Sequence, residues 1–227
     1  MTLLPIRDDV AFLTFDGFPS GWVMFFDFNQ LTGKDTYKLL TGVVVPRPIA
    51  WVVTLKENGD LNAAPFSFFN ALSGDPPIVG LGIGNHGANK KDSRLNIERT
   101  GEFVINLVSA SMAESMNITA IEYPYHVDEL AEARLQTAPS IKVAPPRIVG
   151  SPVALECRLL KEVEIDDRRS IFLARVEGVH VDDAAVIDAE KCYIDGHKLE
   201  LIGRMHGAGW YAKTTDLFNM PRLPVPE

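Results

Sequence analysis

Four short segments between Pro46 and Ile97 carry the strongest structural signals in this chain: PRPIAWVVT (46–54), NAAPFSFFN (62–70), DPP (75–77) and KKDSRLNI (90–97). The first becomes an unbroken apolar run after Pro48 and predicts a strand. The third predicts a turn, because Asp and Pro favour turn initiation. The last predicts a helix start, since Asp92 and Ser93 are both good N-cap residues.

Similar apolar runs recur along the rest of the chain and predict strands at 49–55, 77–84, 102–108, 153–165, 170–181 and 199–204. The expected helices are few and short, at 34–40, 92–100, 110–120 and 127–135. Strands therefore outnumber helices, and the two do not alternate. This pattern favours a mainly β protein, with a closed antiparallel sheet of six strands, over a doubly wound parallel one.

Several common site types are excluded. The glycines of GLGIG (80–84) are not followed by the rest of a dinucleotide-binding loop at a helix start, so we reject a Rossmann interpretation. Cys157 and Cys192 lie far apart, which gives no zinc or redox spacing and predicts two buried or half-buried free thiols. We expect no metal, because no metal-ligand spacing relates the histidines, which are His86, His126, His180, His197 and His206.

The composition is that of a soluble globular protein, with 46% apolar and 23% charged residues. The net charge of −8 argues against a non-specific nucleic-acid binder. No apolar run approaches the roughly 20 residues of a membrane span. The opening MTLLPIRDD turns acidic where a signal peptide stays apolar, so we expect a cytoplasmic protein.

We expect one main domain at 36–212, with an extension at 1–35 and a tail at 213–227. The extension is too apolar to be a loose tail and is predicted to pack on the barrel. The proline-rich segment 138–152 is an extended connector inside the domain. The tail is also extended, and we expect it to lie across a neighbouring subunit.

The segment NAAPFSFFN has small residues that let a ligand approach the backbone and aromatic rings that can form apolar walls. If it is extended, alternate residues face opposite sides, so one face can meet a ligand and the other the core. An ordinary aromatic core strand that enters a turn is an equally good interpretation of this segment alone.

The segments KKDSRLNI and RPIAWVVT offer polar groups. A helix N-terminus carries unpaired N–H groups and partial positive charge, and two lysines beside it would suit a phosphate. A capped, solvated surface helix is the plainer alternative. Arg47 is held between two prolines, and Thr54 ends a strand with a hydroxyl to offer. Arg47 could equally pair with a carboxylate for structural reasons.

The order of these segments resembles the flavin reductase-like FMN-binding split-barrel family, in particular its flavoredoxin-type branch. The resemblance covers about residues 36–212 and includes VVPRPIAWVVT, GDLNAAPFSFFNALSGDPPIVGLGIG, KDSRLNI, EFVINLV, VDELAEARL, PPRIVGSPVALECRL and RSIFLARVEGVHV. It implies a six-stranded antiparallel Greek-key barrel. It also implies a homodimer with non-covalent FMN near the dimer interface, and electrons that come from NADH or NADPH.

Carried over position by position, the resemblance places Arg47, Pro48 and Thr54 beside the flavin. The segment along the ring and ribityl chain comprises Asn62, Ala64, Pro65, Ser67, Phe68 and Asn70. The phosphate end comprises Lys91, Ser93 and Asn96, and His126 lies in a loop near the ligand. The chain departs from the family at Arg134, where relatives often have glycine, and in RMHGAGWY (204–211), which contains His206 and Trp210.

The resemblance implies a flavin reductase that passes electrons from NAD(P)H to FMN, and on to a partner monooxygenase, another acceptor protein or free flavin. No side chain is assigned as a catalytic acid or base. Thr54 and Ser67 are expected to orient hydride transfer to flavin N5. The alternatives are an FMN-dependent oxidase of a small substrate, related to pyridoxamine-phosphate oxidase, and a flavin-binding protein without turnover.

Overall fold

The computed structural model describes residues 2–7, 10–14 and 23–223. The chain divides into two compact units, Met1–Val45 with Met205–Trp210, and Pro46–Arg204 with Tyr211–Glu227. Among the described residues, every helix is too short or too polar to cross a membrane.

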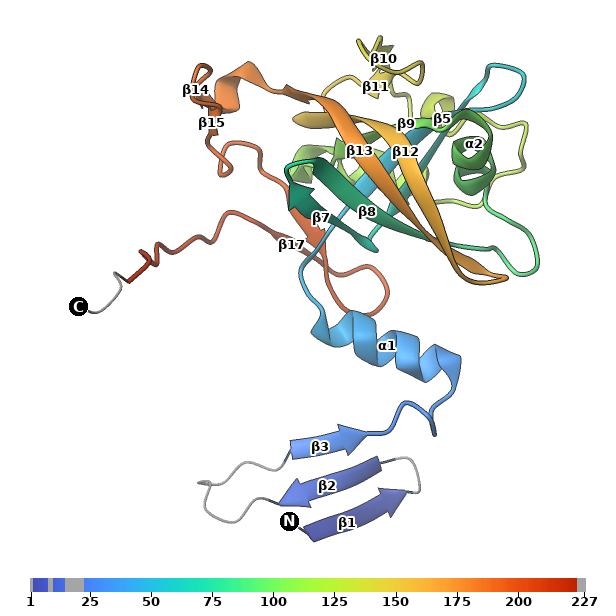
Figure 1. The fold of residues 1–227 in the computed structure, drawn as a ribbon, viewed down its shortest axis with the longest axis vertical. Helices are drawn as coiled ribbons and strands as arrows, with labels where there is room; N and C mark the ends of the chain where they lie inside the picture. Colours follow the sequence, from blue (N-terminus) through green and yellow to red (C-terminus); the bar gives the residue numbers. More distant parts are fainter. Residues whose placement is uncertain (1, 8–9, 15–22, 224–227) are drawn as a thin grey trace. The chain divides into compact units, whose positions relative to one another are not determined.

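The larger unit is built on one antiparallel sheet of seven strands, in the order β6-β5-β9-β12-β13-β8-β7 (Figure 1). In chain order these are β5 (Ala50–Leu55), β6 (Leu61–Phe66), β7 (Phe69–Gly74), β8 (Pro77–Gly84), β9 (Glu102–Leu107), β12 (Val153–Asp166) and β13 (Arg169–Val181). Only Ser67 and Phe68 separate the two edge strands, β6 and β7, in the sequence. The sheet must therefore curl until its edges come close, which makes a barrel.

Strand β5 explains why the run IAWVVT is apolar without alternation. Ala50 and Val52 pack in one buried cluster, and Trp51 and Val53 pack in another. Both faces of the strand are covered, so every position favours an apolar residue. The Trp51 indole N–H is also paired, because it donates to the hydroxyl of Thr119 at 2.8 Å.

Short elements surround the barrel. The helices are α2 (Asp92–Thr100), η1 (Ala110–Met112), α3 (Ala113–Ile118), α4 (Glu129–Glu132) and η2 (Asp183–Ala185). A small sheet has the order β17-β16-β4 and consists of β4 (Arg47–Pro48), β16 (Ile202–Arg204) and β17 (Tyr211–Lys213). Two strand pairs complete the unit, β10 (Thr137–Ala138) with β11 (Arg147–Ile148), and β14 (Val186–Asp188) with β15 (Tyr193–Ile194).

The smaller unit is an antiparallel meander of β1 (Thr2–Arg7), β2 (Val10–Thr14) and β3 (Val23–Phe26), followed by α1 (Gly33–Val43). Thr32 caps α1, since its side chain accepts from the backbone N–H of Asp35. The unit also includes the 205–210 segment, where the rings of His206 and Trp210 stack with centroids 6.1 Å apart. The predicted packing of residues 1–35 on the barrel stays a prediction.

The expected closed antiparallel sheet is confirmed, with some local differences. Five of the six predicted strands lie in this sheet, but the sixth, at 199–204, was wrongly assigned to it, because β16 belongs to the small sheet. The other two strands of the sheet, β6 and β7, come from the 62–70 segment and the residues after it, which were not among the six. The helix expected at 127–135 has only four residues, and Arg134 follows it with a φ of 54°. Cys192 is exposed, contrary to expectation, whereas Cys157 is buried and burial raises its pKa to about 12.

The glycines of GLGIG serve close packing. A Cβ on Gly82 would lie 3.1 Å from Phe68 Cβ and 3.5 Å from Phe68 O, and that oxygen already accepts from Gly82 N at 2.7 Å. A Cβ on Gly80 would instead meet the end of the exposed, flexible Leu72 side chain at 2.7 Å. Of these two glycines, only Gly82 therefore allows the backbone of the β6–β7 junction to lie this close to β8.

We expect Gly82→Ala to lower the free energy of unfolding by about 1–3 kcal/mol, because Phe68 must shift to admit the methyl group. Gly80→Ala is the matched control and should cost less than about 1 kcal/mol, since Leu72 can turn aside. Urea denaturation of both variants measures the difference. Equal losses would contradict this account of the junction.

Candidate functional site

A cleft of about 530 Å³ opens between β6, the N-terminus of α2 and the segment 119–125. Its walls bring together five of the predicted site residues, Asn62, Ala64, Pro65, Lys91 and Ser93. The outer wall contributes residues with no predicted role, namely His86, Asn89, Thr119, Ala120, Ile121, Glu122, Tyr123, Pro124 and Tyr125. Asp92, Phe66, Lys90 and Glu129 complete the lining.

The helix α2 presents its N-terminus to the cleft without a side-chain cap. Its N-cap is Lys91, and no side chain accepts from the first-turn N–H groups there. The sequence predicted Asp92 or Ser93 as the cap, which is wrong because the helix already begins at Asp92. The end of α2 thus combines unpaired donors, partial positive charge and the exposed Lys91, which is a chemistry that suits an anion.

A network of buried polar side chains forms the floor of the cleft. Its members, which we name the floor network, are Thr54, Asn62, Ser93, Asn96 and Glu129. Ser93 Oγ and Thr54 Oγ1 donate to Asn62 Oδ1 at 3.1 and 3.4 Å, and Asn96 Nδ2 donates to Thr54 Oγ1 at 3.0 Å. Asn62 Nδ2 in turn donates to Glu129 Oε1 at 2.9 Å.

Thr54 and Asn96 lie beneath the cleft. Their exposed fractions are 0% and 2%, and neither lines the cleft. The hydroxyl of Thr54 is engaged by both Asn96 and Asn62. In this structure the two residues therefore hold Asn62 in place, and a direct contact between Thr54 and a flavin would require the network to open.

Hydrogen bonds from Lys56 and a contact between His86 and Glu122 hold the outer wall. Lys56 Nζ donates to the carbonyls of Tyr125 and Val127, each at 2.7 Å, and so fixes the segment that ends at α4. His86 Nδ1 and Glu122 Oε1 lie 2.7 Å apart across the cleft mouth. Burial raises the pKa of Asp92 at the start of α2, and the charge of Lys56 opposes that rise.

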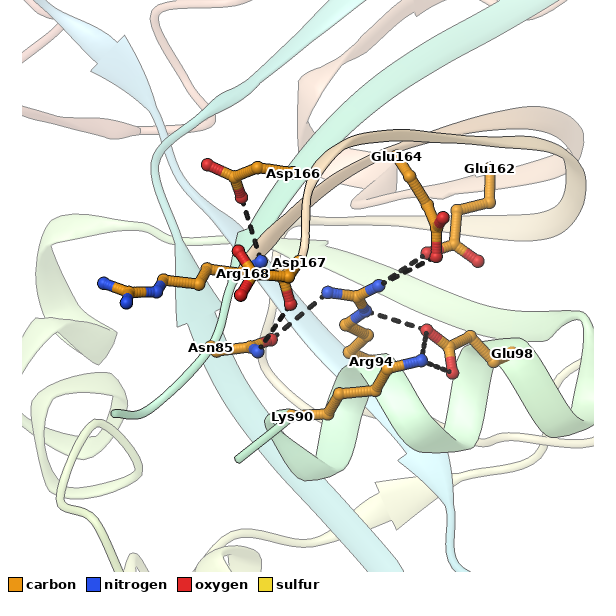
Figure 2. Close-up of polar contacts among 9 residues, drawn as sticks. All are labelled: Asn85, Lys90, Arg94, Glu98, Glu162, Glu164, Asp166, Asp167 and Arg168. Atoms are coloured by element: carbon orange, nitrogen blue, oxygen red, sulfur yellow. Dashed lines mark hydrogen bonds and ion pairs between the residues drawn. The ribbon is translucent and has the colours of Figure 1, made fainter. Parts of the chain in front are cut away.

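Figure 2 shows the contacts that fix α2 on the barrel. The guanidinium of Arg94 is 1% exposed and donates to Glu98 Oε1 at 2.8 Å, Asn85 Oδ1 at 3.2 Å and Glu162 Oε1 at 3.1 Å. Lys90 binds both carboxylate oxygens of Glu98 at 2.8 Å. Lys90 is thereby committed to the helix, so Lys91 is the lysine of this pair whose charge is available at the cleft.

A second group of predicted residues lies at the β6–β7 junction and on β4, which lies beside β7. This group consists of Arg47, Pro48, Ser67, Phe68 and Asn70. Phe68 is 44% exposed and Arg47 is 8% exposed. Strand β6 connects the two groups, since its end at Phe66 lines the cleft and Ser67 follows directly.

His126 belongs to neither of these two groups of predicted site residues. It is exposed and does not line the cleft, although its neighbour Tyr125 does. Its segment is held through the backbone by Lys56. Among the described residues, no three His, Cys, Asp or Glu side chains are placed to hold a metal ion.

Sequence reasoning missed Glu129 and the outer wall. Glu129 lies 67 residues from Asn62 in the chain, so no local spacing connects them. The available local signal was Asp128, which caps α4 by accepting from Leu130 N and Ala131 N and thereby fixes where Glu129 begins the helix. That signal predicts a helix start and says nothing of a cleft.

Comparison with known proteins identifies the family. The family model described as flavin reductase like domain matches residues 42–198. An uncharacterized protein of Deinococcus radiodurans is 44% identical over 203 residues, which are 87% of this chain and 89% of that protein.

Two solved structures are similar over most of the chain. Component B of nitrilotriacetate monooxygenase from Bacillus cereus is 30% identical, with a TM-score of 0.82 over 88% of this chain and all of that one. The 2-nitrobenzoate 2-nitroreductase NbaA of Pseudomonas fluorescens is 32% identical, with a TM-score of 0.79 over 89% of this chain and 96% of that one. These similarities confirm the mainly β split-barrel fold. Because the family model matches more than half of the residues of this chain, the chain belongs to the flavin reductase-like domain family.

Proposed function

We propose that this protein is an FMN-dependent oxidoreductase of the flavin reductase type, which takes electrons from NAD(P)H and passes them to a partner protein or to free flavin. The observation that carries the proposal is the cleft at the uncapped N-terminus of α2, where Lys91 and the Ser93 hydroxyl meet unpaired helix N–H groups. The Lys91 ammonium and the helix N–H groups fit the dianionic phosphate of FMN. The similarity to a monooxygenase component B supports a role as electron supplier.

The predicted residues then divide into two tasks. Lys91 and Ser93 would hold the phosphate, while Asn62, Ala64 and Pro65 would line the ribityl chain along β6. The ring would lie toward Ser67, Phe68 and Asn70, with Arg47 and Pro48 on the neighbouring β4 and Thr54 and Asn96 supporting the floor. His126, which does not line the cleft, would lie at the edge of the bound flavin. When bound, FMN would supply a hydride acceptor, and the chain would supply orientation and charge.

Anaerobic mixing tests the reductase assignment. We expect the purified protein to be yellow or to become so with FMN, and NADH or NADPH should bleach the visible flavin band. Bleaching by neither nucleotide would refute the reductase assignment and leave a flavin-binding protein without turnover. A protein that takes up no FMN would refute the cofactor as well.

A second candidate is direct reduction of a small aromatic substrate on the bound flavin, which the similarity to NbaA favours. Reduced protein mixed anaerobically with 2-nitrobenzoate distinguishes the two. Prompt reoxidation that this compound alone causes would support the second candidate. Reoxidation only by oxygen, free flavin or an acceptor protein would support the first.

The proposal includes a cytoplasmic homodimer. Phe68 and Leu72 cover Gly82 and Gly80 on the outside of β8, and Ile171 pairs with Gly82 in register on β13. These three side chains are exposed by 44%, 58% and 38%, which leaves apolar surface beside the proposed ring end. Light scattering should give twice the chain mass of 25.0 kDa, and a monomer would contradict this part.

A further inference from the structure

The floor network has a single direction of hydrogen-bond donation. Asn62 Oδ1 receives both hydroxyl protons, one from Ser93 and one from Thr54. The Asn62 amide nitrogen therefore faces Glu129, which also accepts from Ala63 N at 3.2 Å. Asn96 Nδ2 donates to Thr54 Oγ1, so donation runs from Asn96 and Ser93 through Asn62 to the carboxylate.

The carboxylate sets this direction. An ionised carboxylate can only accept, so it forces Asn62 to present its nitrogen to Glu129 and its oxygen to Ser93. The Ser93 proton is then used inside the network, and the lone pairs of Ser93 Oγ remain for the cleft. Because Glu129 is 7% exposed and lines the cleft, its protonation state is connected to the ligand space by two hydrogen bonds.

We propose that Glu129 is a positioning residue that couples proton uptake to binding of the flavin phosphate. When Glu129 is neutral, it can donate to Asn62, the amide turns over, and Asn62 Nδ2 faces Ser93. The Ser93 hydroxyl is then free to donate to a phosphate oxygen. The proposal rests on the proposed function, since it needs a phosphorylated flavin in the cleft.

Thr54 makes the turned amide of Asn62 unfavourable while Glu129 is ionised. With the amide turned over, the buried Thr54 hydroxyl would face two donors, Asn96 Nδ2 and Asn62 Nδ2, and its own proton would lose its acceptor. A buried donor without an acceptor is costly. The turned amide is therefore favoured only when Glu129 is protonated or when an anion accepts the Ser93 proton.

The charges around Glu129 are mixed. The charge of Lys56 acts on Glu129, Lys91 and Asp92 line the same cleft, and the His86–Glu122 pair stands at the cleft mouth. Burial raises the pKa of Glu129, and its hydrogen bonds and the charge of Lys56 oppose that rise without cancelling it. A phosphate dianion in the cleft would favour the neutral form further.

The test measures FMN and riboflavin dissociation constants by fluorescence quenching for the whole protein at a series of pH values on both sides of neutrality. At the upper end, Glu129→Gln should bind FMN about tenfold more tightly than the parent and leave riboflavin within about twofold. Glutamine can still accept from Ala63 N while its amide N–H donates to Asn62 Oδ1. Comparison at equal pH cancels the ionisation of the phosphate itself.

Two further variants test whether the gain in FMN affinity depends on the Ser93 hydroxyl. In a Ser93→Ala background the gain from Glu129→Gln should disappear, because the hydroxyl that it frees is absent. Asp92→Asn is the charge control, since it removes another cleft carboxylate that is not a member of the floor network. Any gain from Asp92→Asn should persist in the Ser93→Ala background.

A gain from Glu129→Gln that persists without Ser93, or no gain at all, would overturn the proposal. Should Glu129→Gln not fold, the pH dependence of the FMN-to-riboflavin affinity ratio in the parent and in Ser93→Ala remains decisive. Ser93→Ala should flatten that dependence, and an unchanged profile would refute the coupling. Failure of the parent to bind either flavin would refute the proposed function instead.

Discussion

Replacing Arg94 with methionine should lower the free energy of unfolding by about 3 kcal/mol. The guanidinium is 1% exposed and meets Glu98 and Glu162, whose side chains are each 22% exposed. Methionine fills similar space but leaves Glu162 without this cation and Glu98 with Lys90 alone, which costs more than the lost attraction. Denaturant unfolding followed by circular dichroism measures the loss.

Lys90→Met is the matched control for Arg94. Lys90 also binds Glu98, but its side chain is 38% exposed, so its loss should cost less than about 1 kcal/mol. Equal losses for the two variants would show that burial of Arg94 does not matter. Such a result would also remove the reason to regard α2 as anchored through this residue.

The same cluster predicts an acid-sensitive contribution. Partial burial acts to raise the pKa of Glu98, but the hydrogen bonds from Lys90 and Arg94 outweigh it and lower that pKa. The contribution of Glu98 is therefore fully present above the unfolded-state value of about 4.3 and is lost as pH falls through the lower folded value. In Arg94→Met this acid-side loss should shrink.

Local patterns predicted elements whose signals are local. The apolar run at 49–55 became β5, and the helix at 92–100 was placed correctly because Gly101 ends it in the left-handed conformation, with a φ of 69°. Arg134 also has a positive φ, but it is not a glycine. The resemblance implies glycine at this position, and the φ of 54° is one that glycine adopts most easily.

The cleft itself could be predicted only in part, because its walls come from distant parts of the chain. Asn62 and Ser93 were assigned from motifs, but the residue that orients Asn62 is Glu129, and the residue that fixes the outer wall is Lys56. Both act across about 70 residues through contacts that no periodicity encodes. Sequence patterns therefore located the groups that would meet a ligand, and packing determined what holds them.

The adjacent lysines at the start of α2 give the sharpest test of the phosphate site. Lys91→Ala should weaken FMN binding by about 10- to 100-fold and riboflavin by less than about twofold, because only FMN has the phosphate that the lysine would neutralise. Lys91 is exposed, lines the cleft and has its Nζ 5.7 Å from the centre of the Phe66 ring. In the part of the chain that the structure describes, no carboxylate pairs with its ammonium as Glu98 pairs with Lys90. Fluorescence titration of both flavins measures the effect.

Lys90→Ala is the control, one residue away with the same charge. Its ammonium is bound by both oxygens of Glu98 at 2.8 Å, so its loss should change FMN affinity by less than about threefold. The Lys91 effect should also diminish as ionic strength rises, since screening weakens an exposed charge. Equal losses for the two lysines would mean that general positive charge attracts the ligand, and an equal loss of riboflavin would mean that Lys91 contacts another part of the flavin.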